Sequence, residues 1–246
     1  MSLLPACCSS PDDRWPWPHP LPGLHLISLG FESDRFHPDD FRCSDIIPPP
    51  SVERAVSKRQ SEYLAGRFCA REGLSRLTGR PDTPAQGADR APVWPTGCVG
   101  SITHTRGWAA AVVGHQQHYR GLGLDAEMIM PDDRALPLSR QILTQPEQAR
   151  FGCELTHQPG FLITLAFCLK ETLFKALYPL VQKRFYFEHA ELLAWHRDGT
   201  ARLRLLTTLS PEWPIHSELN AWFSLENDRL ISLIAIPAHN PASHSA

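Results

Sequence analysis

The chain has 246 residues, of which 42% are hydrophobic and 20% charged, and its formal net charge is −2 at pH 7. This length can bury one large or two small hydrophobic cores, and the near-neutral charge excludes nucleic-acid binding through bulk positive charge. No apolar run reaches the roughly 18 residues of a membrane span, and the scattered cysteines form no C-x-x-C pair, so we expect a cytoplasmic protein.

The first half combines a proline-rich start with a strand and a long helix. Prolines crowd the first fifty residues, which predicts irregular segments that follow the protein surface. A strand is predicted at Leu24–Phe31 and a helix at Ser51–Leu77. Within this helix Gly66 costs about 1 kcal/mol relative to alanine, which indicates a close packing contact. Arg67 and Arg71 are one turn apart on one side, either as a solvated face or as phosphate ligands.

A connector and a strand pair complete the first half. Gly79–Gly97 is rich in Pro, Gly and Asp, and it contains Arg90. The pattern of Val99–Val113 predicts two strands with a turn between them. Thr103 and His104 lie at the end of the first strand, among small hydroxylated residues. There the histidine is either a structural residue or a phosphate contact, and the sequence leaves both interpretations open.

The second half begins with acidic residues on a predicted strand at Gly121–Glu127. Asp125 and Glu127 are two positions apart, so a strand points both carboxylates to the same face. Such a pair is usually the polar face of a strand. With a third carboxylate it would form the kind of oxygen site that Mg²⁺ uses when it also binds a phosphate.

The third carboxylate is predicted on the helix Phe161–Tyr178, which we expect Pro179 to end. Its leucines recur at steps of three and four residues, the mark of a helix with one buried face. Glu171 and Lys175 lie nearly opposite that stripe, one turn apart. A Glu–Lys pair of this spacing is otherwise a surface pair worth a few tenths of a kcal/mol.

The remaining elements complete an α+β pattern. The expected segments are a partly helical Pro131–Phe151, a hairpin at Glu191–Leu205 turning at Asp198–Gly199, strands at Ala221–Leu225 and Leu230–Ile236, and a tail at Pro237–Ala246. The order strand, helix, strands occurs twice. It predicts two similar α+β halves, residues 1–120 and 121–246.

Five segments in this order resemble the 4′-phosphopantetheinyl transferase superfamily, in its larger surfactin- and enterobactin-synthetase type. They are YLAGRFCAR (63–71), RAPVWP (90–95), SITHT (101–105), GLDAE (123–127) and FCLKETLFKA (167–176). Each motif is weak alone, and their succession at family-like separations is specific. Ala126 and Cys168 depart from the more frequent larger aliphatic residue and serine.

The resemblance implies a monomer of two halves related by a pseudo-twofold axis, with the active site and coenzyme A in the cleft between them. It assigns the binding of coenzyme A to the matching residues Arg67, Arg71, Arg90, Thr103, His104 and Lys175. It assigns Mg²⁺ to Asp125, Glu127 and Glu171. The first half would hold the nucleotide end, and the second the metal, the central helix and the carrier-protein docking surface.

The implied reaction transfers the 4′-phosphopantetheine arm of coenzyme A to a serine of an apo acyl or peptidyl carrier protein, releasing 3′,5′-ADP. Glu171 is our first choice for the base that takes the serine proton, Glu127 is the competing candidate, and Lys175 would neutralise charge on the leaving phosphate. The pathway would be siderophore, fatty-acid or polyketide synthesis. Basic residues of the second half that could meet an acidic carrier are Arg134, Arg140, Arg150, Lys183 and Arg184.

Two other functions remain open at this stage. One is a different Mg²⁺-dependent phosphate enzyme, such as a nucleotide hydrolase that uses the same three carboxylates. The other is a non-catalytic module that binds coenzyme A or a carrier protein. The first predicts metal-dependent phosphate release without a carrier, and the second predicts binding without product.

Overall fold

The computed structural model describes residues 3–238, which form two compact units. Unit 1 contains the described residues up to Trp15, then Pro20–Arg120 and the residues from Pro237, while unit 2 contains Pro16–His19 and Gly121–Ile236. Both units mix helices with antiparallel strands, which is compatible with the predicted α+β class. No helix among these residues is long and apolar enough to cross a membrane. The predicted tail lies almost wholly outside the described residues.

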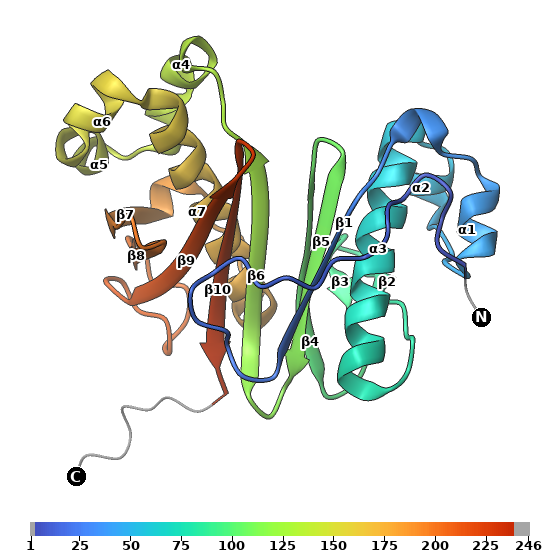
Figure 1. Cartoon of the computed structure of the whole chain (residues 1–246). Coiled ribbons are helices and arrows are strands. Elements are labelled where there is room, and N and C mark those ends of the chain that lie inside the picture. The colour runs from blue at the N-terminus through green and yellow to red at the C-terminus, as the bar shows by residue number, and fades with distance from the viewer. Residues whose placement is uncertain (1–2, 239–246) are drawn as a thin grey trace. The chain divides into compact units, whose positions relative to one another are not determined.

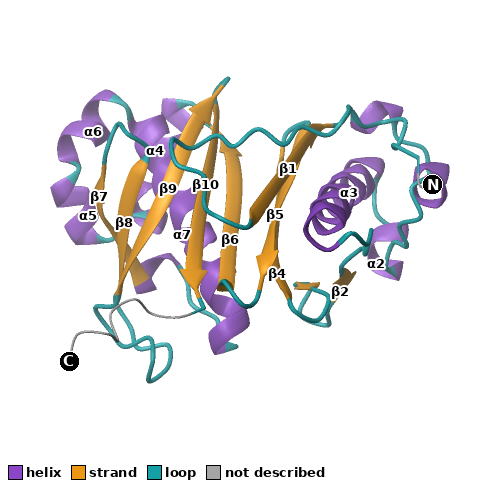
Figure 2. Ribbon diagram, turned by 60° about the horizontal axis from the view of Figure 1, so that its bottom comes forward, coloured by secondary structure: helices purple, strands orange, loops and turns teal. Residues whose placement is uncertain are grey.

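Unit 1 is a three-stranded antiparallel sheet with one long helix on it (Figure 1). Its strands are β1 (Leu24–Gly30), β5 (Trp108–His115) and β4 (Cys98–Thr105), in the spatial order β1-β5-β4. The sequence therefore predicted all three. The helix α3 (Ser57–Thr78) packs on this sheet (Figure 2).

Glycine allows α3 to approach the sheet closely. A Cβ atom on Gly66 would lie 2.8 Å from Cγ2 of Ile102, and one on Gly73 would lie 2.9 Å from Cγ2 of Val113. Both distances are shorter than carbon atoms tolerate, so each position requires glycine. The predicted packing contact at Gly66 is confirmed.

The start of the long helix was predicted six residues too early. The structure has a short helix α2 (Pro50–Glu53) and then a break before α3. The Gln60 side-chain amide donates to the carbonyl oxygens of Ala55 (2.7 Å) and Glu53 (3.0 Å) and thereby fixes the break. Side-chain hydrogen bonds of this kind are invisible to periodicity. The short elements η1 (Ser33–Arg35), α1 (Asp39–Cys43), β2 (Ala85–Gln86) and β3 (Pro92–Val93) complete unit 1.

The N-terminal segment covers the free edge of β1. Asp12 and Ser28 exchange backbone hydrogen bonds of 2.7 and 2.8 Å, and the Ser9 amide donates to the Gly30 carbonyl at 2.9 Å. An exposed strand edge invites pairing with another chain, so this coverage protects the sheet. The prediction of an irregular segment along the surface is confirmed.

Unit 2 is a five-stranded sheet with one long central helix. The spatial order is β6 (Tyr119–Met128), β10 (Arg229–Pro237), β9 (Glu218–Glu226), β8 (Thr200–Leu205) and β7 (Ala190–Trp195). The predicted hairpin is the β7–β8 pair, with Gly199 at a positive φ of 85° in its turn. The helices of this unit are α4 (Asp132–Ile142), α5 (Gln145–Arg150), α6 (Gly152–His157), α7 (Pro159–Val181) and the 3₁₀ turn η2 (Phe187–His189).

The helix α7 differs from its prediction in two ways. It is buried on more than one side, because the sheet contacts one side and α4 and α6 contact another. It also continues through Pro179 to Val181 and ends at Gln182, whose φ of 51° is left-handed. A proline this close to a C-terminus disturbs only the last turn, so the prediction that Pro179 ends the helix is wrong.

Candidate functional site

The site in unit 2 begins with two glycines that let α7 lie against β6. A Cβ atom on Gly123 would lie 2.0 Å from the Thr172 carbonyl oxygen, and one on Gly121 would lie 2.6 Å from that of Ala176. Side chains alternate along a strand, so Asp125 and Glu127 share the face of these glycines. The close approach therefore sets the carboxylates of β6 beside the polar side of α7.

Asp125 and Lys175 form the closest contact of the site. The Lys175 ammonium lies 2.6 Å from Oδ1 of Asp125 and also donates to the Leu124 carbonyl oxygen at 3.1 Å. Asp125 is 5% exposed. Burial alone would lower the pKa of Lys175, but the charge of Asp125 and the hydrogen bond to it outweigh burial and raise that pKa. The lysine therefore remains a cation.

Glu127 and Glu171 are half-buried carboxylates in the same electrostatic field. Burial, followed by the negative charge of Asp125, raises the pKa of Glu127 to about 7, and Glu171 adds to the effect. Burial and the charge of Asp125 also raise the pKa of Glu171. Asp125 acts on the pKa of both glutamates, so these carboxylates lie within electrostatic range of Asp125, without the spacing of a coordination shell.

The donor chemistry of this group suits a hard divalent cation. Carboxylate oxygens are the ligands that Mg²⁺ prefers, and the Lys175 ammonium shows that Asp125 accepts a cation at Oδ1. Within residues 3–238, no three His, Cys, Asp or Glu side chains already have the spacing of a coordination shell. The metal assignment of Asp125, Glu127 and Glu171 therefore stays a prediction.

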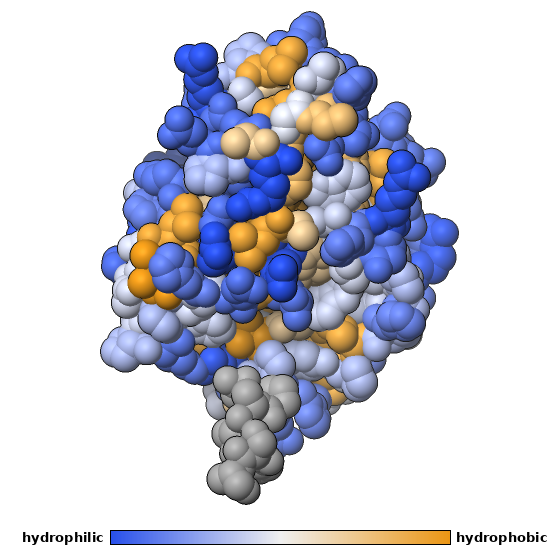
Figure 3. All heavy atoms as spheres, turned by 90° about the vertical axis from the view of Figure 1, so that its left-hand side faces the viewer, coloured by the Kyte–Doolittle hydropathy of each residue, from blue (hydrophilic) through white to orange (hydrophobic). Residues whose placement is uncertain are grey.

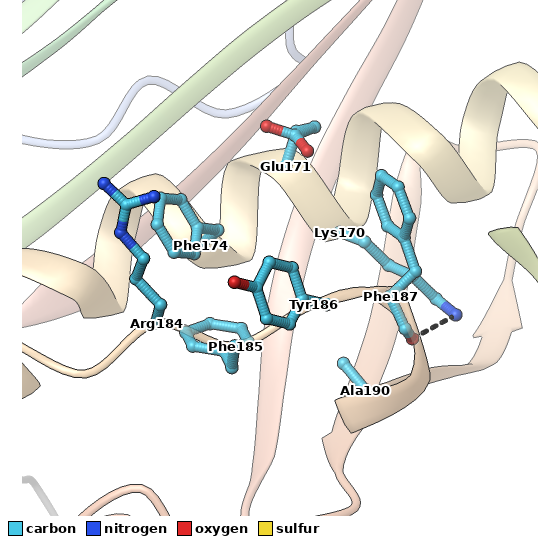
Figure 4. A pocket seen from close by; sticks show the side chains of 8 residues that line it. All are labelled: Lys170, Glu171, Phe174, Arg184, Phe185, Tyr186, Phe187 and Ala190. Carbon is cyan, nitrogen blue, oxygen red and sulfur yellow. Dashed lines mark hydrogen bonds between the residues drawn. The ribbon is translucent and has the colours of Figure 1, made fainter. Parts of the chain in front are cut away.

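A pocket of about 200 Å³ opens beside Glu171 (Figure 4). Phe174 on α7 and Phe185 on the following segment give it aromatic walls, and Arg184 lies near its rim in the view of Figure 4. Tyr186 is exposed and Phe187 half-buried, so the pocket reaches solvent on this side. Sequence reasoning missed this pocket. The aromatic run FYF (185–187) was its signal.

The basic residues of unit 2 have different surroundings. Arg150 donates to the Leu192 carbonyl oxygen at 2.8 Å and forms an ion pair with Glu191. These contacts attach α5 to β7. Lys183 donates to the Thr208 carbonyl oxygen at 2.9 Å. The positive charge of Lys175, and to a smaller extent that of Arg134, lowers the pKa of Glu127 against burial and the two other carboxylates. The face in Figure 3 is largely hydrophilic, with separate small hydrophobic patches.

In unit 1 the predicted arginines of α3 are buried rather than solvated. Arg67 lies 4.8 Å above the Tyr63 ring and donates to the Ala85 carbonyl oxygen at 3.4 Å. Arg71 donates to the Ser44 carbonyl oxygen. Among the described residues, the Nε atoms of both arginines are buried and have no hydrogen-bond acceptor.

His104 belongs to a small charged group that includes a residue the sequence reasoning did not select. Arg59 Nη1 lies 3.0 Å from Nε2 of His104, and Glu62 lies 3.5 Å from Arg59 and 3.9 Å from His104. Thr103 precedes His104 on β4 and is buried. Arg59 stands eight positions before Arg67 on the same helix, a spacing that could have suggested a shared side.

Arg90 lies in the β2–β3 hairpin, whose Ala85 accepts the hydrogen bond from Arg67. It is exposed in the turn between β2 and β3, where its φ is 72°, and its amide donates to the Gly87 carbonyl oxygen at 3.0 Å. The sequence predicted only a connector there. The small hairpin that presents Arg90 has strands too short for a periodic signal.

Comparison with known proteins gives the same family for both parts of the chain. The model of the 4′-phosphopantetheinyl transferase N-terminal domain matches residues 48–114, and that of the 4′-phosphopantetheinyl transferase superfamily matches residues 121–233. The second match covers the strand and the helix that carry the carboxylates.

Three named relatives are similar in sequence to this chain over most of its length. It is 35% identical over 184 residues to the 4′-phosphopantetheinyl transferase Npt of Nocardia iowensis, covering 72% of this chain and 78% of that one. It is 31% identical over 192 residues to the 4′-phosphopantetheinyl transferase PptT of Mycobacterium tuberculosis, covering 69% and 80%. It is 30% identical over 235 residues to enterobactin synthase component D of Salmonella typhimurium, covering 94% of each chain.

Proposed function

This chain belongs to the 4′-phosphopantetheinyl transferase superfamily, and from this premise we propose how its own residues transfer the arm of coenzyme A to a carrier-protein serine. The central observation is the contact between β6 and α7. It joins the Lys175 ammonium to Asp125 at 2.6 Å, and the charge of Asp125 raises the pKa of both Glu127 and Glu171, which supports a site built from these residues.

Asp125, Glu127 and Glu171 would hold Mg²⁺. When bound there, the ion would polarise the attacked phosphorus and stabilise the charge of the departing 3′,5′-ADP. Phosphoryl transfer depends mainly on positioning and charge neutralisation, which suits a site built from fixed charges. Lys175 contributes a further cation, because the field of Asp125 keeps it protonated.

Glu171 would take the serine proton. Its raised pKa makes it a better proton acceptor than an ordinary surface glutamate. It also lines the open pocket, where an incoming hydroxyl could reach it. Glu127 has a pKa of about 7 and remains the competing base, but it is not among the residues that line the pocket.

The aromatic pocket would hold the uncharged arm. The arm is attached to the attacked phosphorus and therefore begins beside the carboxylates. Because it consists of amide and methylene groups, it needs an uncharged surface to lie against. Phe174, about one helical turn after Glu171, provides such a surface together with Phe185 of the segment that follows α7. The pocket volume of about 200 Å³ accommodates part of the arm and leaves its end towards solvent.

The phosphates at the nucleotide end would be bound by residues of unit 1. Buried Arg67 and Arg71 would contribute positive charge, and His104 lies beside the Arg59 guanidinium. Thr103 would add its hydroxyl, and Arg90 would approach from its hairpin turn. Four expectations stay predictions: that a pseudo-twofold axis relates the two halves, that the nucleotide lies between them, that the protein is a monomer, and that it is cytoplasmic.

Mass spectrometry of an apo carrier protein incubated with coenzyme A and Mg²⁺ tests the proposal. We expect the carrier to gain the mass of one phosphopantetheine arm, and we expect Asp125→Ala or Glu171→Ala to abolish the gain while the protein still folds. Unimpaired transfer by both variants would refute the assignment. Phosphate release without a carrier would favour the hydrolase, and binding without product would favour the non-catalytic module.

A further inference from the structure

Lys170 precedes Glu171 on α7 but points away from solvent into an enclosed polar site. Its ammonium donates to Oε2 of Glu147 and to the Ile142 carbonyl oxygen, both at 2.8 Å. It also donates to the Phe187 carbonyl oxygen at 3.1 Å, the dashed line of Figure 4. An ammonium has three donors, and this geometry uses all of them.

The acceptors of Lys170 belong to three separate elements. Ile142 is the last residue of α4, Glu147 lies in α5, and Phe187 begins η2. Glu147 extends the network, because its Oε1 accepts a hydrogen bond of 2.7 Å from the Leu192 amide of β7. One buried cation thus fixes the position of α4, α5, η2 and β7 relative to α7.

This network lies directly behind the aromatic pocket. Lys170, Phe187 and Ala190 are among the residues that line the pocket, and Glu171 lines it from the next position of α7. Successive residues of a helix point about 100° apart, so Lys170 and Glu171 project from different sides of α7. Lys175 contacts Asp125, whereas Lys170 contacts Glu147.

We propose that Lys170 is a positioning residue that holds the η2 wall of the aromatic pocket at a fixed distance from Glu171. This inference rests on the proposed function for its effect on coenzyme A, and on the contacts alone for its effect on η2. The lysine touches neither the metal nor the phosphates. Its removal changes how the arm is held and leaves the binding of the nucleotide end unchanged.

The test uses the double variant Lys170→Met/Glu147→Gln. Removing one member of a buried ion pair leaves an uncompensated charge and endangers folding, whereas removing both charges together avoids this problem. Lys170→Gln/Glu147→Gln is a milder second variant, because it also removes both charges while the amide at position 170 keeps two donors for the surrounding carbonyl oxygens. Arg202→Met is the matched control, since it removes an exposed cation from β8 in the same unit.

Three measurements separate positioning from phosphate binding. Hydrogen exchange of the unliganded protein reports the order of residues 185–192. Steady-state kinetics with coenzyme A and calorimetry with 3′,5′-ADP compare a ligand that has the arm with one that lacks it. We expect faster exchange in residues 185–192, a KM for coenzyme A raised about 10- to 100-fold as for other supporting residues, and an unchanged Kd for 3′,5′-ADP. Lys170→Gln/Glu147→Gln shows the same changes to a smaller extent, and Arg202→Met shows none.

Two results would overturn the inference. A weaker Kd for 3′,5′-ADP in the double variant would make Lys170 a phosphate ligand. Unchanged exchange together with an unchanged KM would show that the pocket wall does not depend on it. If the wild-type protein transfers no arm while the double variant exchanges faster, the positioning role stands and the proposed function fails.

Discussion

Glu127 is the residue at which, under the proposed function, a proton and a metal ion would compete. Its pKa of about 7 lies above the ordinary value of 4.5, because burial and Asp125 disfavour the charged form in the folded protein. A carboxyl group with a raised folded-state pKa contributes stability at low pH, and this contribution is lost as the pH rises from 4.5 towards 7. Metal binding needs the ionised form and therefore displaces the proton.

We predict that Glu127→Gln is more stable than the wild-type protein in chelator at pH 8, and that the difference disappears near pH 4.5. Glutamine has no charge to bury, so it avoids the penalty that ionisation imposes on the wild-type protein. Urea unfolding at both pH values measures the free energies of unfolding. A difference that is the same at both pH values would show that ionisation of Glu127 is not its cause.

His104 allows a second prediction at the scale of one residue. It lies beside Arg59 on β4, and we propose that it binds a phosphate at the nucleotide end. His104→Ala should raise the KM for coenzyme A with little change in kcat, because the lost contact is the same in the bound substrate and in the transition state. A loss of kcat at saturating coenzyme A would contradict this role.

At the scale of elements, the contact between β6 and α7 determines the geometry of the site. The Thr172 carbonyl oxygen lies where a side chain at position 123 would begin. We predict that Gly123→Ala destabilises the protein by about 1–3 kcal/mol, the usual cost of overpacking. It should also reduce transfer, because α7 must move and carry Glu171 and Lys175 away from Asp125. Thermal unfolding and the carrier assay measure the two effects.

Gly152→Ala is the matched control for this change. Gly152 lies at the start of α6, and a Cβ atom there would have no neighbour within 4 Å. We therefore expect unfolding and transfer close to those of the wild-type protein. Equal destabilisation by both substitutions would show that the close approach at Gly123 is not the reason for its glycine.

The elements themselves were largely predictable, and the exceptions have physical causes. The strands of both sheets followed from alternation and turn residues, as in the hairpin with Gly199 at its turn. The central helix was predicted with one buried face because its leucines form a stripe. The structure also buries Cys168 and Thr172, which meet Ser232 of β10 at 3.1 and 2.5 Å. Small polar residues that satisfy one another give no periodic signal.

For the whole molecule, the order of short motifs identified the family before any geometry was known. Strand spacing placed Asp125 and Glu127 on one face, and helix spacing placed Glu171 and Lys175 on one side of the helix. The sequence identified these residues for that reason. The contacts of Arg71 with Ser44, and of Lys170 with Glu147, join residues more than twenty positions apart. Local spacing does not reveal such partners, so the residues that hold the candidate site in place could be identified only from the fold.

The central claim is that three carboxylates from β6 and α7 hold one divalent ion. A crystal structure with Mn²⁺ and coenzyme A, with anomalous difference density collected for manganese, measures this directly. We predict one manganese peak bonded to oxygen atoms of Asp125, Glu127 and Glu171 at about 2.0–2.2 Å, the range of small octahedral cations. A manganese site elsewhere in the chain, or one that leaves Glu171 outside the coordination shell, would contradict the account.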